Sequence, residues 1–112
     1  MLEVRRTELF SQWMCELRDS KARARIQTRI DRLQLGLRGD VQPVGIDRLQ
    51  LGLCGDVQPV GEGISEMRID YGPGYRVYFI QRGKQLVILL AGGDKRTQDR
   101  DIKTAQALVR DL

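Results

Sequence analysis

The sequence ISEMRIDYGPGYRVYF, residues 64–79, decides the fold because its apolar side chains recur at every second position. Met67 and Ile69 alternate with charged residues before the turn sequence GPG, and Val77 and Phe79 continue the alternation after it. A period of two is typical of a strand with one buried face. The stretch therefore predicts two strands joined by a tight turn.

The segments that follow predict a third strand and a last helix. QLVILLA, residues 85–91, is apolar on both faces, which favours a central strand. The sequence GGD then leads to Thr97, a good helix cap. The helix expected after it carries one apolar stripe: Ile102, Ala105, Val109 and Leu112.

The segments before residue 64 predict a short strand and two helices. LEVRR, residues 2–6, alternates as a strand does, and Thr7 can cap a first helix. A second helix starting at Ser20 has the apolar stripe Ala22, Ile26, Ile30, Leu33 and Leu37. GDVQPVGEG, residues 55–63, is expected to be a loop. These elements predict an α+β fold, with a short N-terminal strand and a helical hairpin packed on a small antiparallel sheet, and a C-terminal helix.

A tandem duplication interrupts this pattern. IDRLQLGLRGDVQPVG, residues 30–45, is followed by a copy at 46–61 that differs only in having Cys54 where the first has Arg38. Two copies are too few for a repeat fold. We therefore expect one domain over residues 1–112 with the duplicated segment as an insert. Its surplus leucines are a reason to expect a homodimer or a swapped dimer.

The composition points to an anionic partner. Nineteen Lys and Arg stand against fifteen Asp and Glu, a net charge of +4, and fifteen of the nineteen are Arg, whose planar guanidinium fits phosphate. An ordinary solvated surface is the alternative. The chain has no histidine, the commonest general acid–base and metal ligand.

The sequence gives no sign of a membrane or metal protein. LVILLA, residues 86–91, is far shorter than a membrane span, and the start MLEVRRTELF lacks the apolar core of a signal peptide. Cys15 and Cys54 do not have the spacing of metal ligands. We therefore expect a cytoplasmic protein that needs no metal or other cofactor.

Residues 64–79, together with FSQWMCELRD (10–19), GDVQPVGEG (55–63) and LLAGGDKRTQ (89–98), resemble the RelE/ParE superfamily of bacterial toxins. More narrowly, they resemble its phage-derived addiction module killer protein branch. The resemblance covers nearly the whole chain apart from the duplicated segment. It implies a RelE/ParE-like fold and a toxin that a cognate antitoxin, usually one with a helix-turn-helix domain, holds inactive.

The resemblance leaves the target open. RelE-like members cut mRNA in the ribosomal A site without a metal, whereas ParE-like members poison DNA gyrase. The first alternative implies an mRNA interferase, an endoribonuclease that inhibits translation and has the ribosome and mRNA as partners. A third possibility is that the insert leaves a protein that binds its antitoxin but is catalytically impaired. Fold alone does not choose among these.

Four candidate site residues lie on one predicted sheet face, opposite Met67 and Val77: Glu66, Arg68, Arg76 and Tyr78. Metal-free RNA cleavage needs a base for the ribose 2′-hydroxyl, cations for charge on the phosphate and an acid for the leaving 5′-oxygen. The resemblance places Arg76 where RelE-type toxins carry a phosphate-contacting arginine, and Arg68 near a basic position. In a chain without histidine, Glu66 is one candidate base, and Tyr78 can stack on a nucleobase.

Further basic residues extend this candidate site. Lys95 and Arg96 match a basic loop that lines the site in the family, with Lys95 in a catalytic role and Arg96 in RNA binding. Arg5 and Arg6, with the arginine face of the second helix, are expected to contact RNA phosphates. The alternative for Glu66, Arg68 and Arg76 is a cross-strand charge ladder on a wet sheet face.

Overall fold

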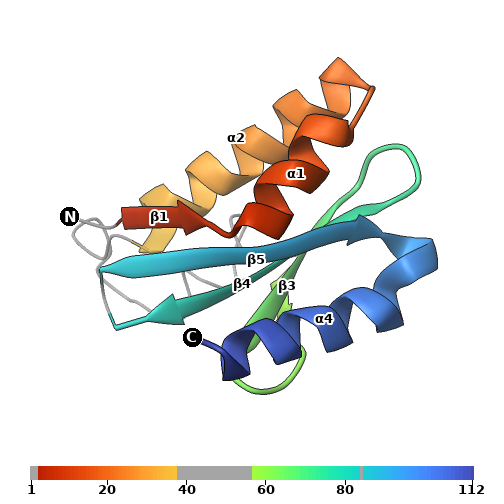
Figure 1. The fold of residues 1–112 in the computed structure, drawn as a ribbon. Coiled ribbons are helices and arrows are strands. Elements are labelled where there is room, and N and C mark those ends of the chain that lie inside the picture. The colour runs from red at the N-terminus through yellow and green to blue at the C-terminus, as the bar shows by residue number, and fades with distance from the viewer. Residues whose placement is uncertain (1–2, 38–56, 84) are drawn as a thin grey trace.

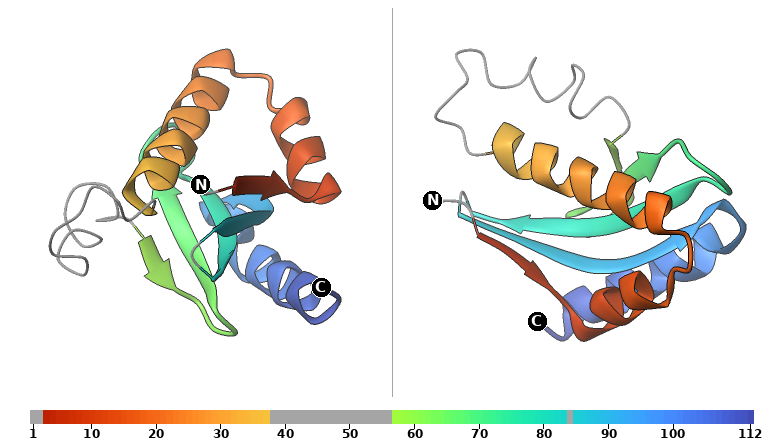
Figure 2. Two further views of the ribbon diagram at one scale, coloured as in Figure 1. Left: turned by 90° about the vertical axis from the view of Figure 1, so that its left-hand side faces the viewer. Right: turned by 90° about the horizontal axis from the view of Figure 1, so that it is seen from above.

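A computed structural model describes residues 3–37, 57–83 and 85–112 of the chain (Figure 1). The elements run β1 (Glu3–Arg6), α1 (Glu8–Glu16), α2 (Ser20–Leu37), β2 (Val57–Pro59), β3 (Ile64–Ile69), β4 (Tyr75–Arg82), β5 (Leu86–Asp94), the 3₁₀ turn η1 (Lys95–Thr97) and α4 (Gln98–Arg110). The described strands form one sheet in the order β1-β5-β4-β3-β2. Helices α1 and α2 cover one face and α4 covers the other (Figures 1 and 2).

The predicted α+β class is confirmed, but the sheet is mixed. The pairs β2–β3, β3–β4 and β4–β5 are antiparallel, whereas β1 pairs parallel with β5. Thr7, just after β1, fixes this pairing because its backbone N–H donates to the Leu89 carbonyl and its hydroxyl to the Leu90 carbonyl. Its side chain also accepts from the Phe10 N–H, which is the predicted cap of α1.

The sheet separates two apolar cores, as the alternation of β3 and β4 predicts. The core under α1 and α2 contains Phe10, Met14, Ile26, Ile30, Leu33, Met67, Ile69, Val77, Phe79, Val87 and Leu89. The core under α4 contains Ile64, Tyr78, Ile80, Leu90, Ala91 and Ala105. Leu112, predicted on the buried stripe of the last helix, is instead 59% exposed because α4 ends at Arg110.

The loop predicted at residues 55–63 is wrong in part, because Val57–Pro59 forms the edge strand β2. Val57 pairs with Met67 and Pro59 with Ser65. A proline fits an edge strand because the missing N–H faces away from the ladder. The predicted insert and the dimer through it concern mainly residues 38–56, which lie outside the described residues. None of the described helices is long and apolar enough to cross a membrane.

Two glycines of β5 allow close packing on both sides of the sheet. A Cβ atom at Gly92 would overlap the ring of Trp13, which belongs to α1. A Cβ atom at Gly93 would overlap the Asp101 carboxylate on the opposite face and lie 2.9 Å from the Thr97 hydroxyl oxygen. The GG sequence therefore lets α1 and α4 approach one strand from opposite sides.

This packing predicts different effects for two neighbouring substitutions. Gly92→Ala and Gly93→Ala are each expected to lower the free energy of unfolding by about 1–3 kcal/mol in urea titrations, because overpacking forces neighbours to move. Trp13 is the single tryptophan of the chain. Its fluorescence emission should therefore shift in Gly92→Ala and stay unchanged in Gly93→Ala. Equal emission shifts in both variants would contradict the placement of Trp13.

Candidate functional site

Glu66 and Arg76 form a buried ion pair on the α4 side of the sheet. β3 and β4 pair antiparallel, with Glu66 opposite Tyr78 and Arg68 opposite Arg76. Arg76 Nη1 donates to Glu66 Oε1 at 3.0 Å. Glu66 is 0% exposed and Arg76 is 8% exposed. The alternative of a wet charge ladder is therefore wrong for this pair.

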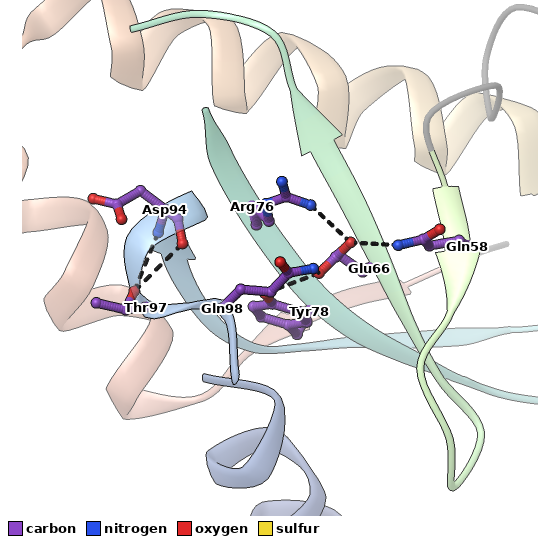
Figure 3. A network of polar contacts seen from close by, with 7 residues as sticks. All are labelled: Gln58, Glu66, Arg76, Tyr78, Asp94, Thr97 and Gln98. Atoms are coloured by element: carbon purple, nitrogen blue, oxygen red, sulfur yellow. Dashed lines mark hydrogen bonds and ion pairs between the residues drawn. The ribbon is translucent and has the colours of Figure 1, made fainter. Parts of the chain in front are cut away.

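Glu66 accepts four hydrogen bonds (Figure 3). Besides Arg76, the donors are Gln58 Nε2 of β2 at 2.9 Å, the Tyr78 hydroxyl at 3.0 Å and Gln98 Nε2 of α4 at 2.8 Å. A carboxylate offers about four lone-pair sites, so this one is saturated. Glu66 thus joins two strands that flank its own strand, and the start of α4, at one point.

These bonds hold Glu66 ionised. Burial raises the pKa of its carboxyl, but the hydrogen bonds and the positive charge of Arg76 outweigh burial and leave that pKa below its ordinary value. Burial, and then the charge of Glu66, raises the pKa of the Tyr78 hydroxyl. In this geometry Glu66 accepts hydrogen bonds and has no lone pair left for a substrate proton, and Tyr78, at 0% exposure, has no surface on which a base could stack.

The lowered pKa of Glu66 predicts acid sensitivity. A group whose folded pKa lies below its unfolded value stabilises the fold above the unfolded pKa, and that stability is lost as the pH falls through the folded pKa. The free energy of unfolding should therefore drop as the pH falls below about 4.5, the ordinary pKa of a glutamate carboxyl, and on through the lowered folded pKa. The drop should be smaller in Glu66→Gln, as measured by urea titration at each pH. Equal drops in both proteins would contradict the contribution of Glu66.

Arg76 also lines a pocket of about 270 Å³ at the turn end of β3 and β4. The other lining residues are Arg68, Ile69, Asp70, Gly74 and Tyr75. Within the described part of the chain, Arg76 Nε has no hydrogen-bond partner, although it is buried. Buried donors are usually satisfied, so this N–H is an unpaired donor in a residue that lines the pocket. The site therefore has a cation that its own structure satisfies only in part.

Lys95 and Arg96 lie at the same end of the sheet as Arg76. Arg76 pairs across from Gly93, two residues before Lys95, and the Cβ of Lys95 is 3.7 Å from the position of a Cβ at Gly74. Lys95 is exposed. Arg96 is exposed too, and its Nη2 lies 3.1 Å from Asp94 Oδ2, whose carboxylate caps the 3₁₀ turn.

The structure thus brings together most, but not all, of the predicted residues. Glu66, Arg76 and Tyr78 contact one another directly, with Arg68, Lys95 and Arg96 around the same end of the sheet. Arg5 and Arg6 lie elsewhere, because β1 places them opposite Ile88 and Leu89, several residues along β5 from the level of Arg76. Arg5 pairs with Glu3 at 2.6 Å, and Arg6 donates to Gln27.

Three residues of the site were not predicted from the sequence. Gln58 and Gln98 are common surface residues in sequence, and only the sheet register and the helix packing bring them to Glu66. Asp70 continues the alternation of β3 and places an exposed carboxylate in the Arg76 pocket. Among the described residues, no group of three or more Cys, Asp or Glu side chains could hold a metal ion.

Two comparisons match most of the chain. The family model described as "Phage derived protein Gp49-like (DUF891)" matches residues 12–110. An uncharacterized protein of Haemophilus influenzae is 41% identical over 111 residues, which cover 99% of this chain and 96% of that protein. No solved structure matches. These matches confirm the phage-derived part of the resemblance, and the assignment to the RelE/ParE superfamily stays a prediction.

Proposed function

Because the chain belongs to the Gp49-like family of phage-derived proteins, we propose that it is the toxin of a toxin–antitoxin pair and acts as a metal-independent, ribosome-dependent mRNA endonuclease. Its partners are then a cognate antitoxin of the helix-turn-helix type, the ribosome and mRNA. The proposal rests on the resemblance of residues 64–79 and 89–98 to RelE/ParE toxins and on the geometry around Arg76.

The observation that carries the proposal is the fixed, partly satisfied guanidinium of Arg76. Glu66 holds one side of it at 3.0 Å, while Nε lacks a partner among the described residues. Arg68 lines the same pocket. A guanidinium held in this way can donate to a phosphate oxygen without first losing side-chain entropy, which is the arrangement that stabilises charge developing in a transition state.

The proposed reaction forms the bond from the ribose 2′-oxygen to phosphorus and breaks the bond to the 5′-oxygen. Arg76 and Arg68 bind the phosphate oxygens as negative charge grows. The exposed Asp70 carboxylate accepts the 2′-hydroxyl proton, a role for which the saturated Glu66 is poorly suited. Lys95 supplies the proton to the 5′-oxygen. The products are a 2′,3′-cyclic phosphate and a 5′-hydroxyl.

Glu66 and Tyr78 take positioning roles in this proposal. Glu66 orients Arg76, and the Tyr78 hydroxyl and the two glutamine amides fix the carboxylate in turn. Arg96 is exposed beside Lys95 and is assigned to RNA backbone contact. Because the pocket holds few groups able to move protons, the ribosome is expected to position the mRNA and to complete the site.

A purified translation reaction tests the function directly. The protein should cut mRNA only when ribosomes are present, and the mapped fragments should carry 2′,3′-cyclic phosphate and 5′-hydroxyl ends. Intact mRNA at doses that arrest growth would overturn the nuclease assignment. DNA breaks and altered supercoiling with whole mRNA would instead support the gyrase-directed alternative.

Deletion of residues 46–61 separates a toxin from an impaired variant. If the duplication is harmless, the full chain and the shortened chain should arrest growth equally on expression. Growth arrest by the shortened chain alone would show that the duplication abolishes toxicity.

A further inference from the structure

A basic groove runs between α2 and the end of β3. Its volume is about 470 Å³, and its charged lining residues are Lys21, Arg25, Arg29, Arg32 and Asp70. The four cations recur at spacings of four, four and three, so they form one stripe along α2. At 1.5 Å per residue this stripe is about 16 Å long, enough for several successive phosphates.

Two of the arginines are held in place. The Arg25 guanidinium carbon lies 4.7 Å from the ring centre of Tyr71, whose hydroxyl donates to Asp19 Oδ2 at 3.1 Å. Arg29 Nη1 donates to the Arg68 carbonyl at 3.0 Å. Side chains fixed in this way lose less entropy when they bind a ligand. The groove is therefore organised before any ligand arrives.

The groove continues into the Arg76 pocket. Ile69 and Asp70 line both, and Arg68, which lines the pocket, is the residue whose carbonyl accepts from Arg29. Arg76 lies on the α4 side of the sheet and α2 on the other side, so an RNA strand with a phosphate bound at Arg76 would pass around the end of β3, at Ile69 and Asp70, to place its neighbouring phosphates beside α2. Figure 2 shows α2 lying along one face of the sheet.

We propose that this α2 groove binds the sugar-phosphate backbone of the RNA strand on one side of the scissile phosphate. The inference rests on the proposed function for the identity of the strand. Arginine forks suit phosphate oxygens, whereas a protein partner needs an apolar anchor at the centre of its site. The apolar residues lining the groove are Ala24 and Ile69, and Ile69 is only 3% exposed. The groove therefore fits RNA better than it fits an acidic protein segment.

Binding of a short single-stranded RNA of 2′-O-methyl nucleotides, which cannot be cleaved, tests the inference without ribosomes. The double variant Arg25→Gln with Arg32→Gln should bind at least about tenfold more weakly in fluorescence anisotropy. Each lost phosphate contact reduces the magnitude of the negative slope of log affinity against log salt concentration by about 0.7. The slope of the double variant should therefore be shallower by about 1.4. The second double variant, Lys21→Gln with Arg32→Gln, leaves the Arg25–Tyr71 contact intact and should show the same loss.

The matched control is Arg82→Gln with Lys103→Gln, which removes the same charge from exposed positions on β4 and α4. It should keep the salt slope of the natural chain. If both groove variants bind like this control, the inference is wrong. If they keep RNA affinity but lose affinity for an oligoglutamate peptide, the groove serves an acidic protein instead. Failure of the proposed function can be told apart from failure of this inference, because it would leave mRNA uncut in the translation reaction whatever the RNA affinity of the groove variants.

Discussion

Replacement of Glu66 with alanine is expected to lower the free energy of unfolding by about 3–5 kcal/mol. The substitution leaves Arg76 buried without its carboxylate, and removing one partner of a buried pair exposes the full desolvation cost of the other. It also leaves the donors of Gln58, Tyr78 and Gln98 without their acceptor. The loss is large because one side chain satisfies groups from three other elements.

Urea titration with two comparison variants checks this result. Glu66→Gln keeps an acceptor oxygen and the side-chain volume, so its loss should be smaller than that of Glu66→Ala. Glu3 also pairs with an arginine, at 2.6 Å to Arg5, but both side chains are more than half exposed. Such surface pairs contribute little. A loss in Glu66→Ala no larger than that in Glu3→Ala would contradict the buried role of Glu66.

The sequence could predict which sheet face holds the site, because a strand alternates its side chains whatever the tertiary fold. Glu66, Arg76 and Tyr78 lie together as expected. The sequence could not predict that they are buried. Burial depends on where α4 begins, and Gln98 in its first turn reaches across to Glu66. A charged pattern on a strand looks the same whether water or a helix covers it.

Two of the errors in the fold, at β2 and β1, have a common physical origin in sheet edges. Pro59 and the flanking glycines are typical of a loop. A three-residue edge strand such as β2 can still contain them, because it forms few hydrogen bonds with its neighbour. The direction of β1 is also decided at a sheet edge, by a few local contacts. Four residues alternate in the same way in a parallel or an antiparallel pair, and the contacts of Thr7 with β5 decide between them.

The same reasoning separates the basic residues. Lys95 and Arg96 come just after the GGD sequence that follows a predicted strand, so their place near its end could be predicted. The position of Arg5 and Arg6 depends on the register of β1 against β5, which nothing in four residues fixes. Their distance from the level of Arg76 therefore emerges only from the structure, and the proposed RNA path uses the α2 groove in their place.

Arg76→Ala is expected to reduce ribosome-dependent mRNA cleavage by about 10²–10³-fold, the usual effect of removing one donor that stabilises developing charge. Arg76→Lys tests geometry apart from charge, because its ammonium can still pair with Glu66 while the planar fork is lost. We expect this variant to stay folded and yet to cleave well below the natural rate.

Matched measurements separate catalysis from folding. Arg82→Gln lies on the same strand, is exposed, and should cleave at the natural rate in the purified translation reaction. Single-turnover rates and urea titrations of each variant should be compared, since Arg76→Ala also removes a partner of buried Glu66. A folded Arg76→Lys protein that cleaves as fast as Arg82→Gln would show that the planar fork has no part in the chemistry. A rate that drops in Arg76→Lys at full stability would support a direct contact between the guanidinium and the reacting phosphate.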